Sequence, residues 1–90
     1  MTETYTYYPR VLDELRRHGL DPLPTTPPDR LRDAISDLYR YEIRRLRSEL
    51  LARRIRRQDY ATHVVELRKR YLLLSIPTEL WTVRGEGQEG

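Results

Sequence analysis

The chain has 90 residues, of which 34% are charged and 38% are hydrophobic, and its formal net charge is +3. A chain of this length forms one small domain, and its leucine, isoleucine and valine content is too high for a disordered segment. It has no cysteine, which excludes disulfides and thiolate chemistry. Its longest apolar run, Tyr71 to Leu74, is far too short to cross a membrane, and its N-terminus does not have the pattern of a signal peptide. We therefore expect a cytoplasmic protein.

The first segment combines a short arm with a short helix. Residues 1–8 alternate threonine and tyrosine after Met1 and Glu3 and are predicted to be a flexible arm, either disordered or extended and tethered to the helices. Pro9 suits the first turn of a helix, and Gly19 followed by a leucine is typical of a helix end. We predict a helix over residues 9–18, whose apolar face contains Val11, Leu12 and Leu15.

A proline-rich connector follows and ends in a helix start. Thr26 is a candidate N-cap, Pro27 fits the first helical position, and Asp29 completes a shortened capping box. From Asp29 to Ile76 the chain contains no glycine or proline. This uninterrupted stretch predicts that most of the protein is long amphipathic helix.

Apolar residues recur through this stretch at alternating spacings of three and four, which is typical of helices that pack along a shared seam. We predict that the seam, and a dimer interface built on it, contains Tyr39, Ile43, Leu46, Leu50, Tyr60, Val64, Leu67, Tyr71 and Leu74. A tyrosine buried in such a seam needs a hydrogen-bond partner, for which Glu42, Glu49 and the arginines are candidates.

Two shapes fit the middle of the chain. The heptad spacing keeps one phase from Tyr39 to Leu74, which fits one long helix, but Arg53 and Arg57 would then put charge at the centre of the seam. An antiparallel hairpin instead places these arginines at a helix C-terminus and Asp59 at the next N-cap. We favour the hairpin, with helices over residues 27–57 and 59–75.

The expected architecture is all-α: a short N-terminal helix, a proline-rich connector and a long antiparallel helical hairpin, in one domain over residues 9–84. Leu80, Trp81 and Val83 form a small apolar clip that can fold back on the helices. Because a lone hairpin leaves apolar surface open on both sides of its seam, we expect two copies to pair into a four-helix bundle. Residues 85–90 are predicted to be a disordered tail.

No set of residues has the spacing of a catalytic, cofactor or metal site. His63 and Glu66 share a helix face, but in the opposite order to the Glu-x-x-His motif of di-metal bundles. The chain also has no glycine-rich phosphate loop. The sequence therefore predicts a protein that is not an enzyme and that needs no metal or cofactor.

Arginine accounts for all but one of the 17 basic residues. Candidate contacts to an anion or a nucleic acid are Arg40, Arg44, Arg47, Arg53, Arg54, Arg56 and Arg57. Acidic residues lie one turn away from several of them, as in Asp37/Arg40 and Glu49/Arg53, so a solvated face of ion pairs explains the same pattern.

These observations favour a small helical module for protein interaction or assembly, which pairs with itself and with another protein. The alternative is a nucleic-acid-binding accessory protein that contacts the phosphate backbone through its arginine clusters.

Overall fold

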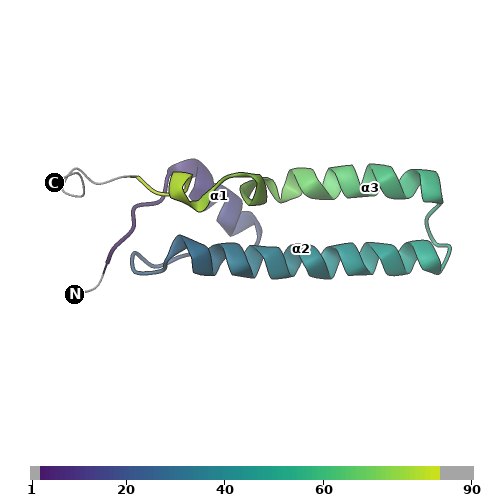
Figure 1. Cartoon of the computed structure of the whole chain (residues 1–90), viewed down its shortest axis with the longest axis horizontal. Helices are drawn as coiled ribbons and strands as arrows, with labels where there is room; N and C mark the ends of the chain where they lie inside the picture. Colours follow the sequence, from purple (N-terminus) through teal and green to yellow (C-terminus); the bar gives the residue numbers. More distant parts are fainter. Residues whose placement is uncertain (1–2, 84–90) are drawn as a thin grey trace.

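A computed structural model describes residues 3–83, and within this range the chain contains helices and no strands. The elements, in chain order, are α1 (Pro9–Arg17), α2 (Pro28–Leu51), α3 (Arg57–Arg70), and two 3₁₀-helices, η1 (Leu72–Ser75) and η2 (Thr78–Leu80) (Figure 1). The prediction of an all-α protein is confirmed. The predicted disordered tail, residues 85–90, lies outside the described residues.

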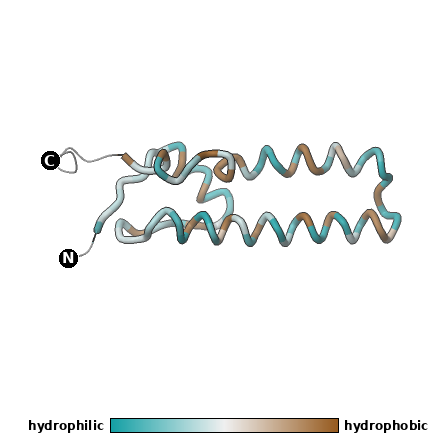
Figure 2. The backbone as a smooth tube through the Cα atoms, in the orientation of Figure 1, coloured by the Kyte–Doolittle hydropathy of each residue, from teal (hydrophilic) through white to brown (hydrophobic). Residues whose placement is uncertain are grey.

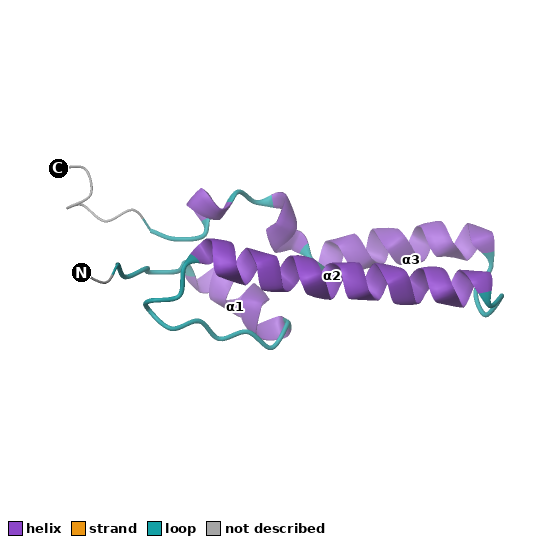
Figure 3. Cartoon of the chain, turned by 60° about the horizontal axis from the view of Figure 1, so that its bottom comes forward, coloured by secondary structure: helices purple, strands orange, loops and turns teal. Residues whose placement is uncertain are grey.

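The two longest helices lie side by side and run in opposite directions (Figures 1 and 3). The turn between them is at one end of the molecule, α1 and η2 are at the other, and η1 lies between η2 and α3. The molecule is therefore elongated, with extents of 57 × 19 × 17 Å. We call the end with the turn the tip and the opposite end the base.

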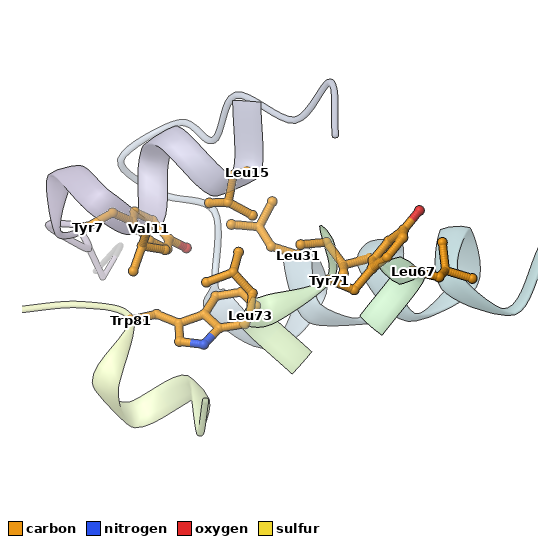
Figure 4. Close-up of a cluster of buried hydrophobic side chains, with 9 residues drawn as sticks. Tyr7, Val11, Leu15, Leu31, Leu67, Tyr71, Leu73 and Trp81 are labelled. Atoms are coloured by element: carbon orange, nitrogen blue, oxygen red, sulfur yellow. The ribbon is translucent and has the colours of Figure 1, made fainter. Parts of the chain in front are cut away.

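The base contains the buried core, to which every helical element except η2 contributes (Figure 4). Trp81, Leu15, Ile35 and Leu73 have almost no exposed surface. The other buried residues are Tyr7, Val11, Leu31, Leu67 and Tyr71. Of these nine core residues, only Leu67 and Tyr71 belong to the predicted seam, so the core is formed mainly by segments that are distant in sequence.

The described part of the N-terminal arm is extended and tethered to the base, which is one of the two alternatives that the sequence left open. Tyr7 forms an isolated antiparallel bridge with Thr82, and the Tyr8 amide donates to the Trp81 carbonyl at 3.1 Å. The Tyr7 ring is buried, and its hydroxyl donates a hydrogen bond to the carbonyl of Thr26. The arm therefore contacts the base from Tyr5 onward, and the side chains of Tyr5 and Tyr7 face the core because alternate residues of an extended segment point the same way.

The two predicted N-caps are wrong. Helix α2 begins at Pro28 without a side-chain cap, because the Thr26 hydroxyl instead accepts a hydrogen bond from the Leu23 amide in the preceding turn. Helix α3 begins at Arg57 rather than at residue 59. Asp59 lies inside its first turn, where its carboxylate pairs with Arg56 at 3.1 Å.

Helix α2 ends at Leu51, six residues before the predicted end at residue 57. Two hydrogen bonds close its last turn, from the Arg54 amide to the Glu49 carbonyl and from the Arg53 amide to the Leu50 carbonyl. This pattern is a Schellman motif, which needs a left-handed residue after the cap. Arg53 occupies that position with φ of 61°, so the chain leaves the helix where the pattern of charges predicted that it would continue.

Helix α1 ends with the same motif built on glycine. The Leu20 amide donates to the Leu15 carbonyl and the Gly19 amide to the Arg16 carbonyl, and Gly19 has φ of 79°. The interpretation of Gly19 as a helix end is confirmed. The chain therefore contains one Schellman motif with the favoured residue and one with an arginine at the strained position.

Replacing Arg53 with glycine is expected to stabilise the folded chain. A left-handed conformation costs an L-residue about 1–2 kcal/mol, and glycine avoids this cost. Glycine loses about 0.5–1 kcal/mol more conformational entropy on folding, which offsets part of the gain. The free energy of unfolding, measured by urea titration with circular dichroism, should rise by about 0.5–1 kcal/mol. Gly19→Ala is the matched control at α1, and it should be destabilising; two changes of the same sign would contradict this account.

Candidate functional site

The predicted seam lies between α2 and α3, but its residues differ in burial. Leu67 and Tyr71 are buried, whereas the other seven seam residues are only half-buried: Tyr39, Ile43, Leu46, Leu50, Tyr60, Val64 and Leu74. Apolar and polar residues alternate around both helices along their whole length (Figure 2). The half of the hairpin near the tip is a single layer of two helices, so neither α1 nor the 3₁₀-helices cover it.

A polar junction joins the hairpin to α1. The Tyr71 hydroxyl donates to the Glu42 carboxylate at 2.5 Å, which links α3 to α2. The imidazole of His18 stacks on the Tyr71 ring at a centroid distance of 4.3 Å, and its Nε2 bonds the Arg70 carbonyl at 2.8 Å. Tyr39 packs edge-on against the same ring at 5.3 Å. Glu42 was among the partners expected for a buried seam tyrosine, and the contact fixes the register of the two helices.

Burial and the hydrogen bond to the Glu42 carboxylate raise the pKa of Tyr71 to about 12, from 10.0. The protonated hydroxyl is therefore the form that the fold favours. Its contribution to stability is complete below pH 10 and is lost as the pH rises through about 12.

Tyr71→Phe is expected to lower the free energy of unfolding by about 1–2 kcal/mol at neutral pH, because the donor to Glu42 is removed. Because phenylalanine does not ionise, the variant should also lose less stability than wild type between pH 10 and pH 12, where the raised pKa of Tyr71 makes the wild type pH-dependent. Urea unfolding across this range measures both effects. Tyr41→Phe, at an exposed tyrosine of α2, is the control; if Tyr71→Phe gave the same pH profile as wild type, the assigned role of the hydroxyl would be wrong.

One face of the hairpin is polar. A shallow hollow on it is lined by Glu42, Arg45, Leu46, Glu49, His63, Leu67 and Arg70. Both carboxylates in this hollow have partners, since Glu42 accepts from Tyr71 and Glu49 pairs with Arg54 at 2.6 Å. The predicted pairing of Glu49 with Arg53 is therefore wrong.

The opposite face is apolar. Two hollows that share Tyr39 lie on it, one lined by Asp37, Tyr39, Arg40, Ile43 and Arg44, and the other by Tyr39, Arg68, Tyr71, Leu74 and Ser75. In an α-helix, residues two apart point in nearly opposite directions, at about 200°. On α2, Ile43 lines one of these hollows and Arg45 lines the polar one. On α3, Arg68 and Arg70 are divided in the same way. These hollows therefore lie across the hairpin from the polar one.

We call this second surface the open face and define it by Tyr39, Ile43, Leu50, Val64 and Leu74. Leu50 lies seven residues after Ile43, and Val64 lies seven residues before Tyr71, so both continue the side of the helix that lines the hollows. All five residues are half-buried, and no residue of α1 lines either hollow. The open face is thus a partly exposed apolar stripe that η1 borders through Leu74, and Tyr39, Ile43 and Leu74 also pack against the core.

No group of three metal-ligating side chains occurs among residues 3–83. In the same range, no helix combines the length and the apolar character that crossing a bilayer requires. Comparison with protein-family models, curated proteins and solved structures finds no match. The surfaces of the hairpin are therefore the basis for a functional proposal.

All seven candidate arginine contacts are exposed. Three of them form ion pairs within the chain: Arg40 with Asp37 at 3.2 Å, as the sequence predicts, Arg54 with Glu49, and Arg56 with Asp59. The other four have no ion pair among the described residues: Arg44, Arg47, Arg53 and Arg57. The structure separates the set into two places, with Arg40, Arg44 and Arg47 along α2 and the remaining four at the tip.

We did not predict from the sequence that charged and apolar residues of α2 line one hollow on the open face. Asp37, Arg40 and Arg44 line it together with Tyr39 and Ile43, so charged and apolar residues that were assigned to different roles are neighbours. The available signal was the spacing of the charged residues, which follow one another by three and four along α2, as the apolar residues do.

Proposed function

We propose that this protein is a non-catalytic assembly module, in which the α2–α3 hairpin binds a second helical surface through its open face. The observation that carries the proposal is that the five open-face residues lie on one side of the hairpin and keep part of their surface exposed, although Tyr39, Ile43 and Leu74 also pack against the core. Two helices alone leave an apolar stripe on the outer side of their seam partly exposed, and the usual solution is a four-helix bundle.

A second copy of the chain supplies the two missing helices. Pairing the open faces of two hairpins buries the same apolar stripe twice and gives a closed dimer. The ordered base of each copy is unaffected, because its core is complete within one chain. Dimerisation therefore adds a second layer of helices over the open face.

The molar mass in solution tests the proposal, by light scattering after size-exclusion chromatography. The expected result for wild type is twice the chain mass of 10.9 kDa. Ile43→Asp puts a charge in the centre of the open face and should give a monomer. Because Ile43 also packs against the core, circular dichroism of the variant is measured in parallel, and a helical monomer is the expected result. Tyr41→Asp changes an exposed residue of α2 that does not line either hollow, and this variant should stay dimeric. A monomeric wild type at 100 µM, or a dimeric Ile43→Asp variant, would overturn the proposal.

The tip supports a second candidate, a nucleic-acid-binding accessory role. Four exposed arginines gather there, and two of them, Arg53 and Arg57, have no ion pair among residues 3–83. Backbone binding of this kind weakens steeply with salt. Reversing the charge of all four tip arginines should abolish binding to a 20-base-pair duplex and leave the dimer intact. Equal binding by wild type and the reversed variant would exclude this role for the tip.

A further inference from the structure

A second stripe runs along α2 beside the open face. Its residues are Asp33, Asp37, Arg40, Arg44 and Arg47, which follow one another at spacings of four, three, four and three. This spacing places all five on one side of the helix, and all five are exposed. Asp37, Arg40 and Arg44 line the same hollow as Tyr39 and Ile43, so the charged stripe borders the open face directly.

The charges of this stripe are arranged antisymmetrically about the middle of α2. Asp33 and Arg47 are each seven residues from position 40, and Asp37 and Arg44 lie three and four residues from it. Helix α2 runs from Pro28 to Leu51, so position 40 is also close to its midpoint. An antiparallel copy of the helix, in full overlap, therefore brings acidic residues opposite basic ones.

From this arrangement we infer that two copies pair through α2 in antiparallel orientation, about a two-fold axis near Arg40. In this pairing Asp33 faces the partner's Arg47 and Asp37 faces the partner's Arg44. The inference rests on the proposed function, because it assigns the partner and the orientation to the same open face. Tyr39 and Ile43 form the apolar centre of the contact, and the charged stripe flanks it, as charged positions flank the seam of a coiled coil.

Most charged residues of the stripe have no ion-pair partner in the described part of their own chain, as this pairing requires. Asp33, Arg44 and Arg47 form no ion pair among the described residues. Asp37 binds Arg40 of its own helix through Oδ1, which leaves Oδ2 for a second cation. Arg40, next to the axis, is thus neutralised within its own helix. A parallel pairing would place aspartate against aspartate and arginine against arginine, and such like-charge contacts are strongly unfavourable.

The complementarity can be tested with two double variants, Asp33→Arg with Asp37→Arg, and Arg44→Asp with Arg47→Asp. The first makes the stripe wholly basic and the second makes it wholly acidic. Each alone should have a dimer dissociation constant at least 10-fold above wild type, because like charges now meet across the axis. An equimolar mixture should form a heterodimer, detected by native mass spectrometry, and the variant with all four changes should recover self-association.

The outcomes separate the register from the proposed function. If both double variants remain as dimeric as wild type while Ile43→Asp dissociates, the open face is the interface but the antiparallel register is wrong. If wild type is monomeric, the second copy is not the occupant, and both ideas fail together.

A cross-linking experiment gives an independent measure of the axis. The chain has no cysteine, so Arg40→Cys introduces one thiol per copy. On the two-fold axis these thiols lie close enough for a disulfide, which needs Cα atoms within about 7 Å. Mild oxidation should convert Arg40→Cys to a covalent dimer, whereas Gln58→Cys, exposed near the tip, should not cross-link. The reverse result would place the tips together and overturn the antiparallel pairing.

Discussion

Trp81→Ala is expected to lower the free energy of unfolding by about 3–5 kcal/mol, the largest loss of any single truncation in this chain. Trp81 has no exposed surface, and its Nε1 donates to the Ile76 carbonyl at 2.9 Å. Its backbone also receives the hydrogen bond from Tyr8, so the residue joins the N-terminal arm to the end of the core. A domain of this size has only about 5–15 kcal/mol of stability in total, so the loss is a large fraction.

Urea unfolding followed by circular dichroism at 222 nm measures this loss, since the variant has no other tryptophan for fluorescence. Leu80→Ala is the matched control, because Leu80 precedes Trp81 directly but is 62% exposed. Its change should stay within about 0.5 kcal/mol. Similar stabilities for the two variants would show that Trp81 does not lie in the core.

Leu67→Asp is expected to abolish stable folding of the hairpin. Leu67 is 3% exposed and lies where α3 meets α2, at the edge of the core. The substitution removes a buried leucine, which costs about 2–5 kcal/mol, and adds the penalty for burying a carboxyl group without a partner. The variant should therefore lose most of its helicity at 25 °C, and any dimer should dissociate with it.

The control for this change is Val65→Asp, two residues earlier on the outer side of α3. Val65 is 49% exposed, and valine and aspartate have similar helix propensities. Thermal unfolding of the control should differ from wild type by no more than a few degrees. A Leu67→Asp variant with wild-type helicity and melting temperature would contradict the placement of Leu67 between the two helices.

Local sequence signals predicted the helices better than their ends. The segment from Asp29 to Ile76 contains no glycine or proline, and this absence predicted the long helical stretch. Gly19 marked the end of α1 correctly. Thr26 and Asp59 have the side chains of good N-caps, yet neither caps a helix. Thr26 instead bonds the Leu23 amide, and Asp59 bonds Arg56. Short polar side chains have several partners within reach in a turn, and sequence alone does not select among them.

The end of α2 was missed for a related reason. A left-handed residue normally appears in sequence as glycine or asparagine, and here it is Arg53. The arginines around it indicated a helix C-terminus, but the predicted end at residue 57 is six residues too late. The amide hydrogen bonds of Arg53 and Arg54 define the turn, and no residue type in the sequence marks them.

The sequence by itself determined the helical class, the amphipathic character of α2 and α3, and Glu42 as a candidate partner for a seam tyrosine, because these follow from periodicity and short-range chemistry. Only the tertiary structure decided that the core lies at the base, with Tyr7 and Trp81 in it, and that the open face adjoins the charged stripe. Those features depend on which distant segments lie side by side. Burial is a property of the whole packed chain, whereas periodicity is a property of one helix.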